Sequence, residues 1–406
     1  MLQGKHIVVG ISGGIAAYKI PELIRLLRKE GAEVKVTTTK NALEFVTELT
    51  LQTLSGYKVY SDVFAAINEH STEHISLPDW ADLMIIAPTT ANVLGKMAHG
   101  IADDALTTTF CAMRKPVVIA PAMNSNMLAC PATQEAIHEL ASWDNVTMLD
   151  CAEGELACGT TGKGRMQEVD AIVEAARYAL TNKDLAGKKV LITSGPTQEA
   201  IDPVRYLTNH SSGKQGASLA MSCWRRGANV TFVTGPSAVE PRVPQLVGVA
   251  QEWRKIRVTS AAEMASQATQ YFADCAVAIL CAAVADFTPS EVSAEKIKKQ
   301  AGQTTYSLEL VTTTDIAATL GATKRAGQKL VGFALETCDE EQHALRKLES
   351  KHLDLIVLNS LQDQGAGFGG DTNKVTLLFA NGTKKDVPLQ SKEDIAHTIV
   401  DSIILL

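Results

Sequence analysis

A cysteine beside a glycine-rich run is the first feature of this sequence that could carry chemistry. Residues 155–166 read ELACGTTGKGRM, and Cys158 stands directly before the glycines. Three roles are open for this stretch: half of a disulfide or metal pair with Cys151, a phosphate-binding loop, or a catalytic thiol. Cys151 lies seven residues away with no histidine at ligand spacing, which disfavours zinc. Ala157 and Gly164 stand where the phosphate loop GxxxxGK[ST] needs Gly and Ser or Thr, which disfavours that loop.

A second glycine turn, GISGGIAAYK at 10–19, separates an apolar strand from a helix. The backbone N–H groups of Ser12, Gly13 and Gly14 and the helix dipole suit a phosphate at this point. The next strand ends in VTTT, without the Asp or Glu that binds the ribose 2′-OH in nicotinamide-dinucleotide sites. The turn therefore favours a ligand with one terminal phosphate, such as FMN. The alternative is a tight turn that binds nothing.

Two polar side chains of the first half are candidates for a site. His74 in STEHISLPDWADL is a lone histidine, and such residues usually lie in the core or on the surface. Asn124 in APAMNSNM follows an apolar strand, and its amide needs hydrogen-bond partners. We expect Asn124 to fix a carboxylate or a carbonyl, whereas the residues around His74 leave catalysis and packing both open.

Charged residues of the second half gather after predicted strands. Asp286 follows the apolar run CAVAILCAAVA, and EKIKK at 295–299 adds a lysine cluster to a neutral half. Lys347 and Lys351 are four residues apart on a predicted helix, so both project from one face. Several lysines and a carboxylate at strand ends suit a triphosphate with Mg²⁺. The alternative is a solvated basic face, which an isolated EKIKK would favour.

The hydrophobic pattern predicts a scaffold that brings strand ends together. The chain alternates apolar strands with amphipathic helices, the pattern of a parallel sheet covered on both faces. KHIVVGISGG and KKVLITSGPT each begin such a run. We therefore predict an α/β protein with two doubly wound, Rossmann-like, mostly parallel-sheet domains, 1–184 and 185–406. Further strands of the first half are expected at 81–88 and 115–123, and a closing helix at about 169–180.

The second half differs from the first by an insertion, QEAIDPVRYLTNHSSGK at 198–214. It lies between the first strand and the first helix of that half. Because ligands bind beyond the carboxyl ends of strands in open α/β sheets, we expect the insertion to shape a ligand site. Later strands are predicted at 275–284, 329–337 and 353–360.

Composition excludes several classes of protein. The 406 residues are 46% hydrophobic and 20% charged, as expected of two or three globular domains. No apolar run reaches the roughly 18 residues that span a membrane, and no N-terminal signal pattern is seen, so we expect a cytoplasmic protein with reduced thiols. Residues 1–184 hold 15 Lys+Arg and 22 Asp+Glu of the 38 and 45 in the chain, which leaves 23 of each for the rest. Neither half has the basic excess of a nucleic-acid binder.

Long motifs in both halves occur in the order of one known family. The first half contains GISGGIAAYK, EHISL, APTTANVLGKMAHGIADD, PAMNSNM and ACGTTGKGRM; the second contains SGPTQEAIDPVRYLTNHSSGKQG, AAVADF, EKIKK, VGFALET and GFGGDTNKV. Together they resemble the bifunctional phosphopantothenoylcysteine decarboxylase/phosphopantothenate–cysteine ligase family of coenzyme A biosynthesis. The resemblance covers essentially the whole chain, and an ordered set of motifs is more specific than any one of them.

The resemblance implies that residues 1–184 form a flavodoxin-like, FMN-binding decarboxylase. It makes His74 an active-site histidine, Asn124 the residue that holds the substrate carboxylate, and Cys158 the proton donor. The implied course is oxidation of the substrate's cysteinyl thiol to a thioaldehyde, loss of CO₂, and return of the electrons and a proton. The implied FMN contacts are Ser12, Gly13, Gly14, Thr39, Phe45, Thr89, Thr90, Asn92 and Met123.

The resemblance also implies that residues 185–406 form the ligase. This half would activate 4′-phosphopantothenate with CTP and Mg²⁺ as an acyl-cytidylate, from which cysteine displaces CMP; Asn209 and Lys296 match residues of that step. The implied nucleotide contacts are Ala282, Asp286, Lys296, Asp315, Ile316, Phe333, Lys347 and Lys351, and those of the acid substrate are Arg205, Asn209, Ser212 and Gly213. One departure is TTTDI at 312–316, where the family usually reads close to KNPDI. The metal ligands stay unassigned.

Homo-oligomers are implied by the resemblance as well: trimers through the flavin half, dimers through the ligase half, and a dodecamer where both contacts form. FMN would then lie at a subunit interface, with His74 reaching in from a neighbour. Two other classes of protein share some of these features. A nicotinamide-dependent oxidoreductase is disfavoured by the missing acidic residue after the second strand. A non-catalytic flavoprotein subunit is disfavoured by the joint presence of His74, Asn124 and Cys158. No nucleic acid or membrane is expected as a partner.

Overall fold

The structure is a computed structural model that describes residues 1–64, 73–157, 159–237, 239–299, 301, 303–336, 339–360 and 370–406. The chain divides into two compact units. The first contains Met1–Thr181 and Arg242–Ala250, and the second contains Asn182–Pro241 and Gln251–Leu406. A short segment of the second half of the sequence therefore belongs to the first unit.

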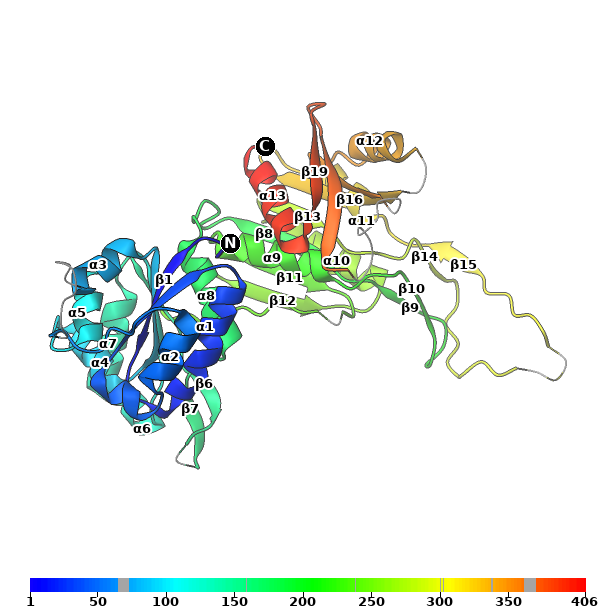
Figure 1. Ribbon diagram of the computed structural model, residues 1–406. Helices are drawn as coiled ribbons and strands as arrows, with labels where there is room; N and C mark the ends of the chain where they lie inside the picture. The colour runs from blue at the N-terminus through cyan, green and yellow to red at the C-terminus, as the bar shows by residue number, and fades with distance from the viewer. Residues whose placement is uncertain are drawn as a thin grey trace. The chain divides into compact units, whose positions relative to one another are not determined.

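The first unit is built on a five-stranded parallel sheet in the order β2-β1-β3-β4-β5 (Figure 1). Its strands are β1 (His6–Ile11), β2 (Glu33–Thr38), β3 (Leu83–Thr89), β4 (Val117–Pro121) and β5 (Val146–Met148), with the antiparallel pair β6 (Ala152–Glu155) and β7 (Thr161–Arg165) beside them. Its helices are η1 (Ile15–Lys19), α1 (Ile20–Lys29), η2 (Lys40–Glu44), α2 (Glu48–Ser55), α3 (Glu73–Trp80), α4 (Ala91–Ala98), α5 (Ala105–Ala112), α6 (Ser125–Leu128), α7 (Pro131–Ala141) and α8 (Val169–Leu180).

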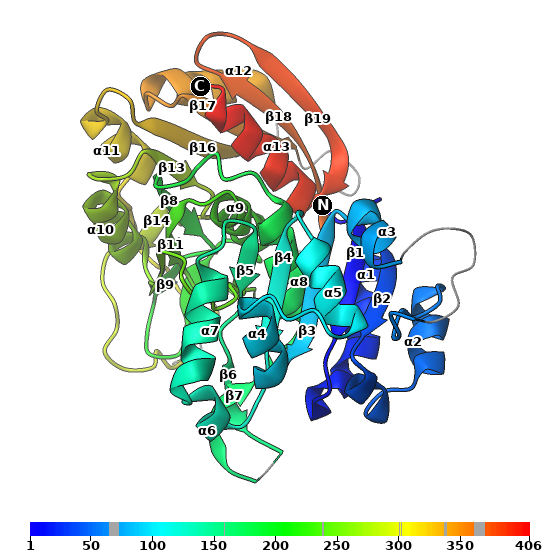
Figure 2. The same ribbon diagram turned by 90° about the vertical axis from the view of Figure 1, so that its left-hand side faces the viewer.

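Alternate residues of β1 pack into two separate cores, one on each face of the sheet. Ile7, Val9 and Ile11 share a core with α1, α2 and α8, whereas Val8 shares a core with α3, α4, α5 and α7. Figure 2 shows α4, α5 and α7 in front of β3, β4 and β5. Side chains of a strand alternate between its faces, so an unbroken apolar strand needs helices on both sides. This arrangement confirms the predicted doubly wound fold.

The second unit has an eight-stranded sheet in the order β12-β11-β8-β13-β16-β17-β18-β19. It is parallel up to β17 and antiparallel beyond it. The strands are β8 (Lys189–Ser194), β11 (Asn229–Thr234), β12 (Trp253–Arg257), β13 (Val277–Leu280), β16 (Lys329–Glu336), β17 (Leu355–Ser360), β18 (Thr372–Phe379) and β19 (Lys384–Ser391). The helices are α9 (Lys214–Arg225), α10 (Ala261–Phe272), α11 (Ile316–Thr323), α12 (Glu340–Ser350) and α13 (Lys392–Ile404).

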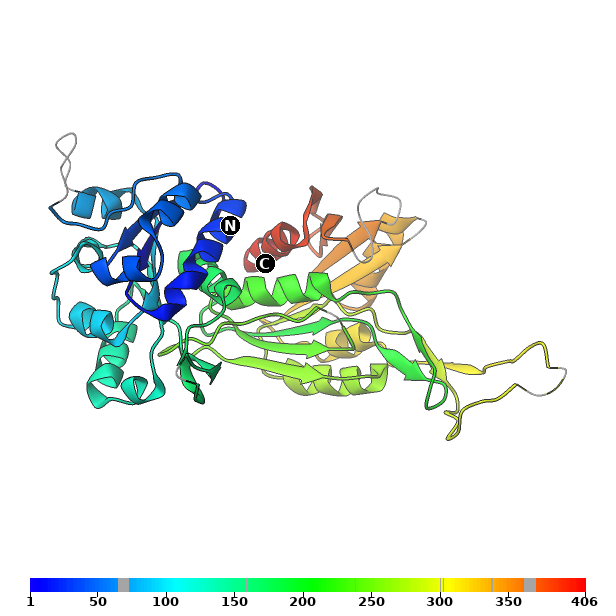
Figure 3. The ribbon, with the colours of Figure 1, turned by 60° about the horizontal axis from the view of Figure 1, so that its bottom comes forward.

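Helices cover both faces of this sheet as well. The helices α10, α11 and α12 share one core with the strands, and α9 packs with α13 (Figure 3, where α9 is green and α13 red). The three later strands predicted for this half each contain an observed strand, β13, β16 and β17. Across the described ranges, no helix is both long and apolar enough to cross a membrane.

The insertion at 198–214 forms the antiparallel pair β9 (Gln198–Ala200) and β10 (Tyr206–Thr208). A second antiparallel pair, β14 (Phe287–Pro289) and β15 (Leu310–Thr312), comes after β13. Both pairs lie beyond the carboxyl end of a parallel strand, where the sequence places its candidate ligase residues. The insertion therefore shapes that end of the sheet.

Residues 242–250, here called the edge segment, extend the sheet of the first unit. The Asp150 N–H donates to the Gln245 carbonyl and the Val247 N–H donates to the Met148 carbonyl, both at 2.8 Å. The segment therefore pairs antiparallel with the chain at β5, the edge strand of that sheet. It belongs to the connection from β11 to its parallel neighbour β12, which contains no helix among its described residues.

Candidate functional sites

A cavity of about 660 Å³, here called the first cavity, opens in the first unit where β1, β3 and β4 end. The β6–β7 hairpin completes its wall. It is lined by Gly13, Gly14, Ile15, Ala16, Tyr18, Lys19, Thr90, Ala122, Met123, Asn124, Met127, Glu155, Leu156, Ala157, Gly164, Arg165 and Met166. The structure thus brings together five residues that were predicted from the sequence to belong to the site: Gly13, Gly14, Thr90, Met123 and Asn124. A cavity of this size suits a cofactor.

A buried hydroxyl shapes the glycine turn after β1. Ser12 Oγ donates to the Pro88 carbonyl at 2.7 Å and accepts from the Thr90 N–H at 3.0 Å, which ties the ends of β1 and β3 together. A side chain on Gly13 would lie 2.5 Å from Asn41 Cβ, so this close approach needs glycine. Gly13 and Gly14 line the cavity, whereas Ser12 holds the turn that presents them.

Other residues predicted to contact the cofactor lie outside the lining of the first cavity. Phe45 and Asn92 are exposed, His74 is half-buried on α3, and the Thr89 hydroxyl donates to a carbonyl of its own strand at 2.7 Å. Thr39 is buried at the carboxyl end of β2, and its hydroxyl has no hydrogen-bond partner within the part of the chain that the structure describes. A buried hydroxyl normally has a partner, so a polar cofactor atom fits this position.

Asn124 is positioned by its own helix and by the β6–β7 hairpin. Its Oδ1 caps α6 by accepting the N–H two residues on at 2.8 Å. On either side of it, the Met123 N–H donates to the Gly164 carbonyl at 2.9 Å and Ser125 Oγ donates to the Lys163 carbonyl at 2.7 Å. A side chain on Gly164, at φ +149°, would lie 2.3 Å from the Met123 carbonyl oxygen. The hairpin therefore fixes the segment that carries Asn124, provided that Gly164 has no side chain.

Cys158 lies outside the described residues, and its catalytic role stays a prediction. Just before it, residues 155–157 line the first cavity. Cys151, the other half of the disulfide or metal pair considered above, is a free and buried thiol. Burial raises the pKa of Cys151 to about 12, so this thiol stays protonated and unreactive at neutral pH.

The second unit holds two adjoining cavities. Cavity A, of about 520 Å³, is lined by Asn209, His210, Ser211, Ser212, Gly213, Lys214, Gln215, Gly216, Cys281, Ala282, Ala283, Val284, Asp286, Phe333, Ala334, Leu335, Asn359, Asn373 and Lys392. Cavity B, of about 400 Å³, is lined by Thr193, Leu280, Ala282, Val284, Ala285, Asp286, Phe287, Thr312, Thr313, Thr314, Asp315, Ile316, Ala317, Gly332, Phe333, Lys347, Lys351, Leu353 and Ile356. They share Ala282, Val284, Asp286 and Phe333. The predicted acid-substrate residues Asn209, Ser212 and Gly213 line A. The predicted nucleotide residues other than Lys296 line B.

Three of the four charged residues that line cavity B, namely Asp315, Lys347 and Lys351, are held in ion pairs. Lys351 lies 2.8 Å from Asp315, and Lys347 lies 2.6 Å from Glu336. Asp315 also caps α11, accepting an N–H at 3.0 Å. Burial works to raise the pKa of Asp315, but the hydrogen bonds from Lys351 and from the helix outweigh it and lower the pKa. The lysines are thereby fixed at the cavity wall, where an anionic ligand would exchange for their carboxylate partners.

The unusual TTTDI segment still lines cavity B. The Thr313 N–H donates to the Asp286 carbonyl at 3.0 Å, and the Thr313 hydroxyl donates to the Ala285 carbonyl at 2.6 Å. A threonine hydroxyl therefore fastens this segment beside Asp286. The local lysine of the family's usual pattern has no counterpart here, and Lys351 is the cation beside Asp315.

The structure does not bring Arg205 or Lys296 into the lining of either cavity. Arg205 forms an ion pair with the buried carboxylate of Asp202, which also accepts the Ile297 N–H at 3.1 Å. The hydrogen bonds from Arg205 and from these backbone groups hold the pKa of Asp202 well below its usual range. Arg205 also donates to the Ile297 carbonyl at 2.7 Å. It therefore fastens the segment of exposed Lys296, and direct ligand contacts for both stay predictions.

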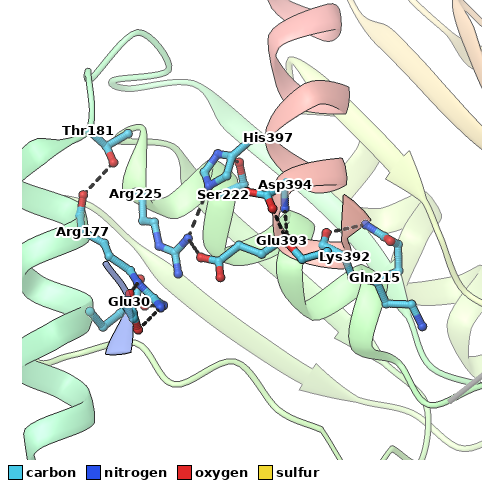
Figure 4. Close-up of polar contacts among 12 residues, drawn as sticks. Glu30, Arg177, Thr181, Gln215, Ser222, Arg225, Lys392, Glu393, Asp394 and His397 are labelled. Carbon is cyan, nitrogen blue, oxygen red and sulfur yellow. Dashed lines mark hydrogen bonds and ion pairs between the residues drawn. The ribbon is translucent and has the colours of Figure 1, made fainter. Parts of the chain in front are cut away.

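Sequence reasoning missed several polar residues of cavity A. They include Lys214, Gln215, Asn359, Asn373 and Lys392, from α9, β17, β18 and α13 (Gln215 and Lys392 are shown in Figure 4). Lys392 lies more than a hundred positions beyond Asp286, and no spacing rule links the two. The signal that was available is the position of Lys214 directly after the glycine at the start of α9. Among the residues that the structure describes, no group of three or more His, Cys, Asp or Glu is placed to hold a metal ion.

Sequence comparison relates both halves of the chain to known families. The family described as Flavoprotein matches residues 1–180, and the family of the DNA/pantothenate metabolism flavoprotein C-terminal domain matches residues 185–406. The coenzyme A biosynthesis bifunctional protein CoaBC of Bacillus subtilis (strain 168) is 46% identical, over 100% of this chain and 98% of the relative. A cysteine/cysteine sulfinic acid decarboxylase of an unknown prokaryotic organism is 45% identical, over 89% of this chain and 99% of the relative. A solved C-terminal domain of a CoaBC protein is 35% identical, covers 55% of this chain and 97% of that chain, and has a TM-score of 0.45.

Proposed function

This chain belongs to the family of coenzyme A biosynthesis bifunctional proteins, and from that premise we propose which half of the chain catalyses which reaction. The protein is an enzyme that joins cysteine to 4′-phosphopantothenate and decarboxylates the product to 4′-phosphopantetheine. Decarboxylation is assigned to residues 1–184 and ligation to residues 185–406. This division is supported by the position of the first cavity in one unit and of cavities A and B in the other.

The first cavity is assigned to FMN and phosphopantothenoylcysteine. Bound FMN supplies a reversible two-electron oxidation of the substrate's cysteinyl thiol, which makes loss of CO₂ easy. Gly13, Gly14 and Thr90 would hold the FMN phosphate, the Asn124 amide would hold the substrate carboxylate, and Cys158 would deliver a proton to the product. The observation that carries this assignment is the meeting of the glycine turn and Asn124 at one cavity of flavin size.

The proton-donor assignment is tested with Cys158→Ser. This variant should still release CO₂ but accumulate the oxidised, unsaturated thiol product, because the proton that completes reduction is missing. The exposed Cys111→Ser is the matched control and should yield 4′-phosphopantetheine normally. Normal product at the normal rate from Cys158→Ser would remove Cys158 from this role. Purified protein should also be yellow, and a colourless protein that cannot be reconstituted with FMN would contradict the flavin assignment.

Cavities A and B are assigned to the two substrates of acyl activation. CTP, with Mg²⁺, would occupy cavity B, where Asp315, Lys347 and Lys351 lie, and 4′-phosphopantothenate would occupy cavity A. The wall that they share, at Asp286 and Phe333, is where the carboxylate would meet the α-phosphate. Lysine charge near this point would offset the negative charge that develops during transfer.

Ligation should require CTP and Mg²⁺, and Lys296→Gln should abolish it while leaving decarboxylation intact. Lys385→Gln, which changes an exposed lysine of β19 outside both cavities, is the control, and it should ligate at close to the parent rate. Ligation by Lys296→Gln at the parent rate would show that Lys296 does not act on the nucleotide. Equal rates with ATP and CTP would withdraw the assignment of CTP.

A second candidate reaction is decarboxylation of free cysteine, because one relative of nearly equal identity is named a cysteine/cysteine sulfinic acid decarboxylase. The two candidate reactions are distinguished by supplying the enzyme with free cysteine and phosphopantothenoylcysteine at equal concentration. CO₂ release from the conjugate alone supports the assignment made here. Comparable release from free cysteine would favour the second reaction.

The enzyme is also proposed to be a cytoplasmic homo-oligomer, with trimers through the flavin half, dimers through the ligase half, and a dodecamer where both form. The exposure of Phe45 and the position of His74 outside the first cavity support a flavin site completed by a neighbouring subunit. Native mass spectrometry tests this: the account expects twelve subunits with bound FMN, and a stable monomer with full decarboxylase activity would contradict it.

A further inference from the structure

A single buried carboxylate joins two segments of the second unit that are far apart in the sequence. Asp202 lies in the turn between β9 and β10, and its side chain is fully buried. Lys296 belongs to the connection from β14 to β15. The strands β9 and β14 lie side by side (Figures 1 and 3). The turn at Asp202 therefore meets the segment that carries Lys296.

The Asp202 carboxylate accepts hydrogen bonds from both segments. Its Oδ1 accepts the N–H groups of Val204 and Arg205, both at 2.8 Å, which closes the turn. Its Oδ2 accepts from Arg205 Nε at 2.9 Å and from the Ile297 N–H at 3.1 Å. Arg205 Nη2 donates to Asp202 as well, and also to the Ile297 carbonyl at 2.7 Å. Both polar groups of the Ile297 backbone are therefore bound, one by Asp202 and the other by Arg205.

This arrangement depends on the charge of Asp202. A buried carboxylate is costly unless charged or polar donors surround it. The hydrogen bonds from Arg205 and from the backbone outweigh the effect of burial and hold the pKa of Asp202 well below its usual range. The carboxylate is therefore ionised at neutral pH, and each of its oxygens can accept more than one hydrogen bond.

A second contact holds the same segment on the other side of Lys296. The Ser293 N–H donates to the Ile201 carbonyl at 3.0 Å. The backbone is thus bound to the turn at Ser293 and at Ile297, while the Lys296 side chain between them is exposed. A lysine on a backbone that is already held loses less conformational freedom when it binds an anion.

We propose that Asp202 is a positioning residue for ligation, which holds Arg205 and Lys296 in the places from which they act on the substrates. This rests on the proposed ligase function, in which Arg205 contacts the acid and Lys296 acts on the nucleotide. Asp202 itself touches neither substrate, because its side chain is buried and its oxygens are bound by the turn and by Ile297. A displacement of about 1 Å in a reacting group can cost about 10²-fold in rate, so a lost support should slow ligation.

The first test is Asp202→Asn, which keeps the shape of the side chain but replaces an accepting oxygen with a donating nitrogen. The kcat/KM for ligation should fall about 10²-fold, with decarboxylation within about twofold of the parent. Glu199→Gln is the matched control. Glu199 is another buried carboxylate of the same insertion, but it accepts the Ala261 N–H at the start of α10, at 2.9 Å. This control should ligate at close to the parent rate.

Acetylation of lysines by acetic anhydride distinguishes a positioning role from general damage to the second unit. In the parent, CTP, Mg²⁺ and 4′-phosphopantothenate without cysteine should protect Lys296, Lys347 and Lys351. In Asp202→Asn, Lys296 should lose this protection, whereas Lys347 and Lys351, which line cavity B, should keep it. Ligation at the parent rate, protection of Lys296 as in the parent, or loss of protection at all three lysines would each overturn the proposal.

Ile297→Pro carries the test if Asp202→Asn does not fold. Proline lacks the N–H that donates to Asp202, and the pair of Asp202 with Arg205 stays intact. Losing this hydrogen bond to a charged group should lower the kcat/KM for ligation about tenfold. Ile297→Ala keeps the N–H and should ligate at close to the parent rate, so equal ligation by the two variants would overturn the proposal. A parent enzyme that does not ligate, or in which the substrates protect none of the three lysines, would instead overturn the proposed function.

Discussion

The two units share a plan, yet their cavities differ in charge. Each begins with a buried strand, a glycine turn and a helix, and each has a parallel sheet covered on both faces. The first cavity is lined mainly by apolar side chains and backbone, and its cations Lys19 and Arg165 both pair with Glu168, at 2.9 Å and 2.7 Å. Cavities A and B are lined by four lysines, of which Lys214 pairs with the exposed Asp371, Lys347 pairs with Glu336 and Lys351 pairs with Asp315. The first cavity therefore suits a flat cofactor, whereas cavities A and B suit ligands with phosphate groups.

The difference arises in the segments that connect the strands. In the first unit the glycine turn passes directly into η1 and the hairpin β6–β7 closes the wall. In the second unit the pair β9–β10 intervenes before α9, and the antiparallel strand β18 and the helix α13 bring Asn373 and Lys392 to the cavity. A common sheet therefore sets where the sites lie, and the connections and additions set their chemistry.

The largest difference between the activities of the two units is expected from Asn124→Asp. The aspartate keeps the side-chain oxygen that caps α6, but it replaces the amide donor with a charge that repels the substrate carboxylate. Decarboxylation should fall by about 10²–10³, with ligation within about twofold of the parent. The measurement is kcat/KM for CO₂ release. A decarboxylase that is unaffected would show that Asn124 does not touch the carboxylate.

A smaller loss, still confined to the first unit, is expected from Gly164→Val. The new side chain would collide with the Met123 carbonyl oxygen and displace Asn124, which should cost roughly 10² in decarboxylation. The control is Gly95→Ala, whose added carbon meets open space. If both variants decarboxylate equally well, the hairpin does not position Asn124.

Arg226→Met should weaken only the second unit. Arg226 pairs with Asp184 at 2.6 Å and with Asp401 at 2.5 Å, and its own side chain is 11% exposed. Its loss should lower the free energy of unfolding by about 2 kcal/mol, so ligase activity should be lost at lower temperature while flavin release is unchanged. The exposed Arg325→Met is the control.

The same pair predicts a pH dependence. The hydrogen bond from Arg226 lowers the pKa of Asp184, so the stabilisation is complete above the ordinary carboxyl pKa near 3.9 and is lost as pH falls through the lowered value. The difference in stability between Arg226→Met and the parent should shrink in that acidic range. A difference that stays constant with pH would contradict the ion pair.

The smallest effect is expected at the edge segment. Val247→Pro removes the N–H that donates to the Met148 carbonyl, and should destabilise the first unit by about 1–2 kcal/mol. Flavin release should occur at lower temperature, with ligase activity lost at the parent temperature. Val247→Ala keeps the N–H and serves as control. Equal midpoint temperatures of flavin release for the two variants would mean that this pairing contributes nothing to the stability of the first unit.

Much of the fold could be predicted because its signals are local. Apolar runs, glycine turns and the helix pattern at 169–180 depend on neighbouring residues, and α8 forms at Val169–Leu180. The residues around the glycine turn and Asn124 come after β1, β3 and β4, whose carboxyl ends meet in any parallel sheet. The place of these residues at one site could therefore be predicted from the sequence.

The rest depends on contacts between distant residues. Nothing near Lys392 in the sequence indicates that it lines cavity A, since its position there depends on the packing of α13 beside α9. Arg205 is expected from the sequence to contact substrate, but the buried partner that holds it, Asp202, is visible only in the folded chain. The edge segment is likewise an ordinary connection by sequence, and its hydrogen bonds with Asp150 and Met148, which assign it to the first unit, are visible in the folded chain.

The central claim is that one chain links ligation to decarboxylation. It is tested most directly by supplying the purified enzyme with 4′-phosphopantothenate, CTP, Mg²⁺ and cysteine labelled with ¹³C at its carboxyl carbon. The account predicts labelled CO₂ and CMP in equal amounts, with 4′-phosphopantetheine as product and no labelled CO₂ when CTP is left out. Labelled CO₂ without CTP, or CMP without labelled CO₂, would contradict it.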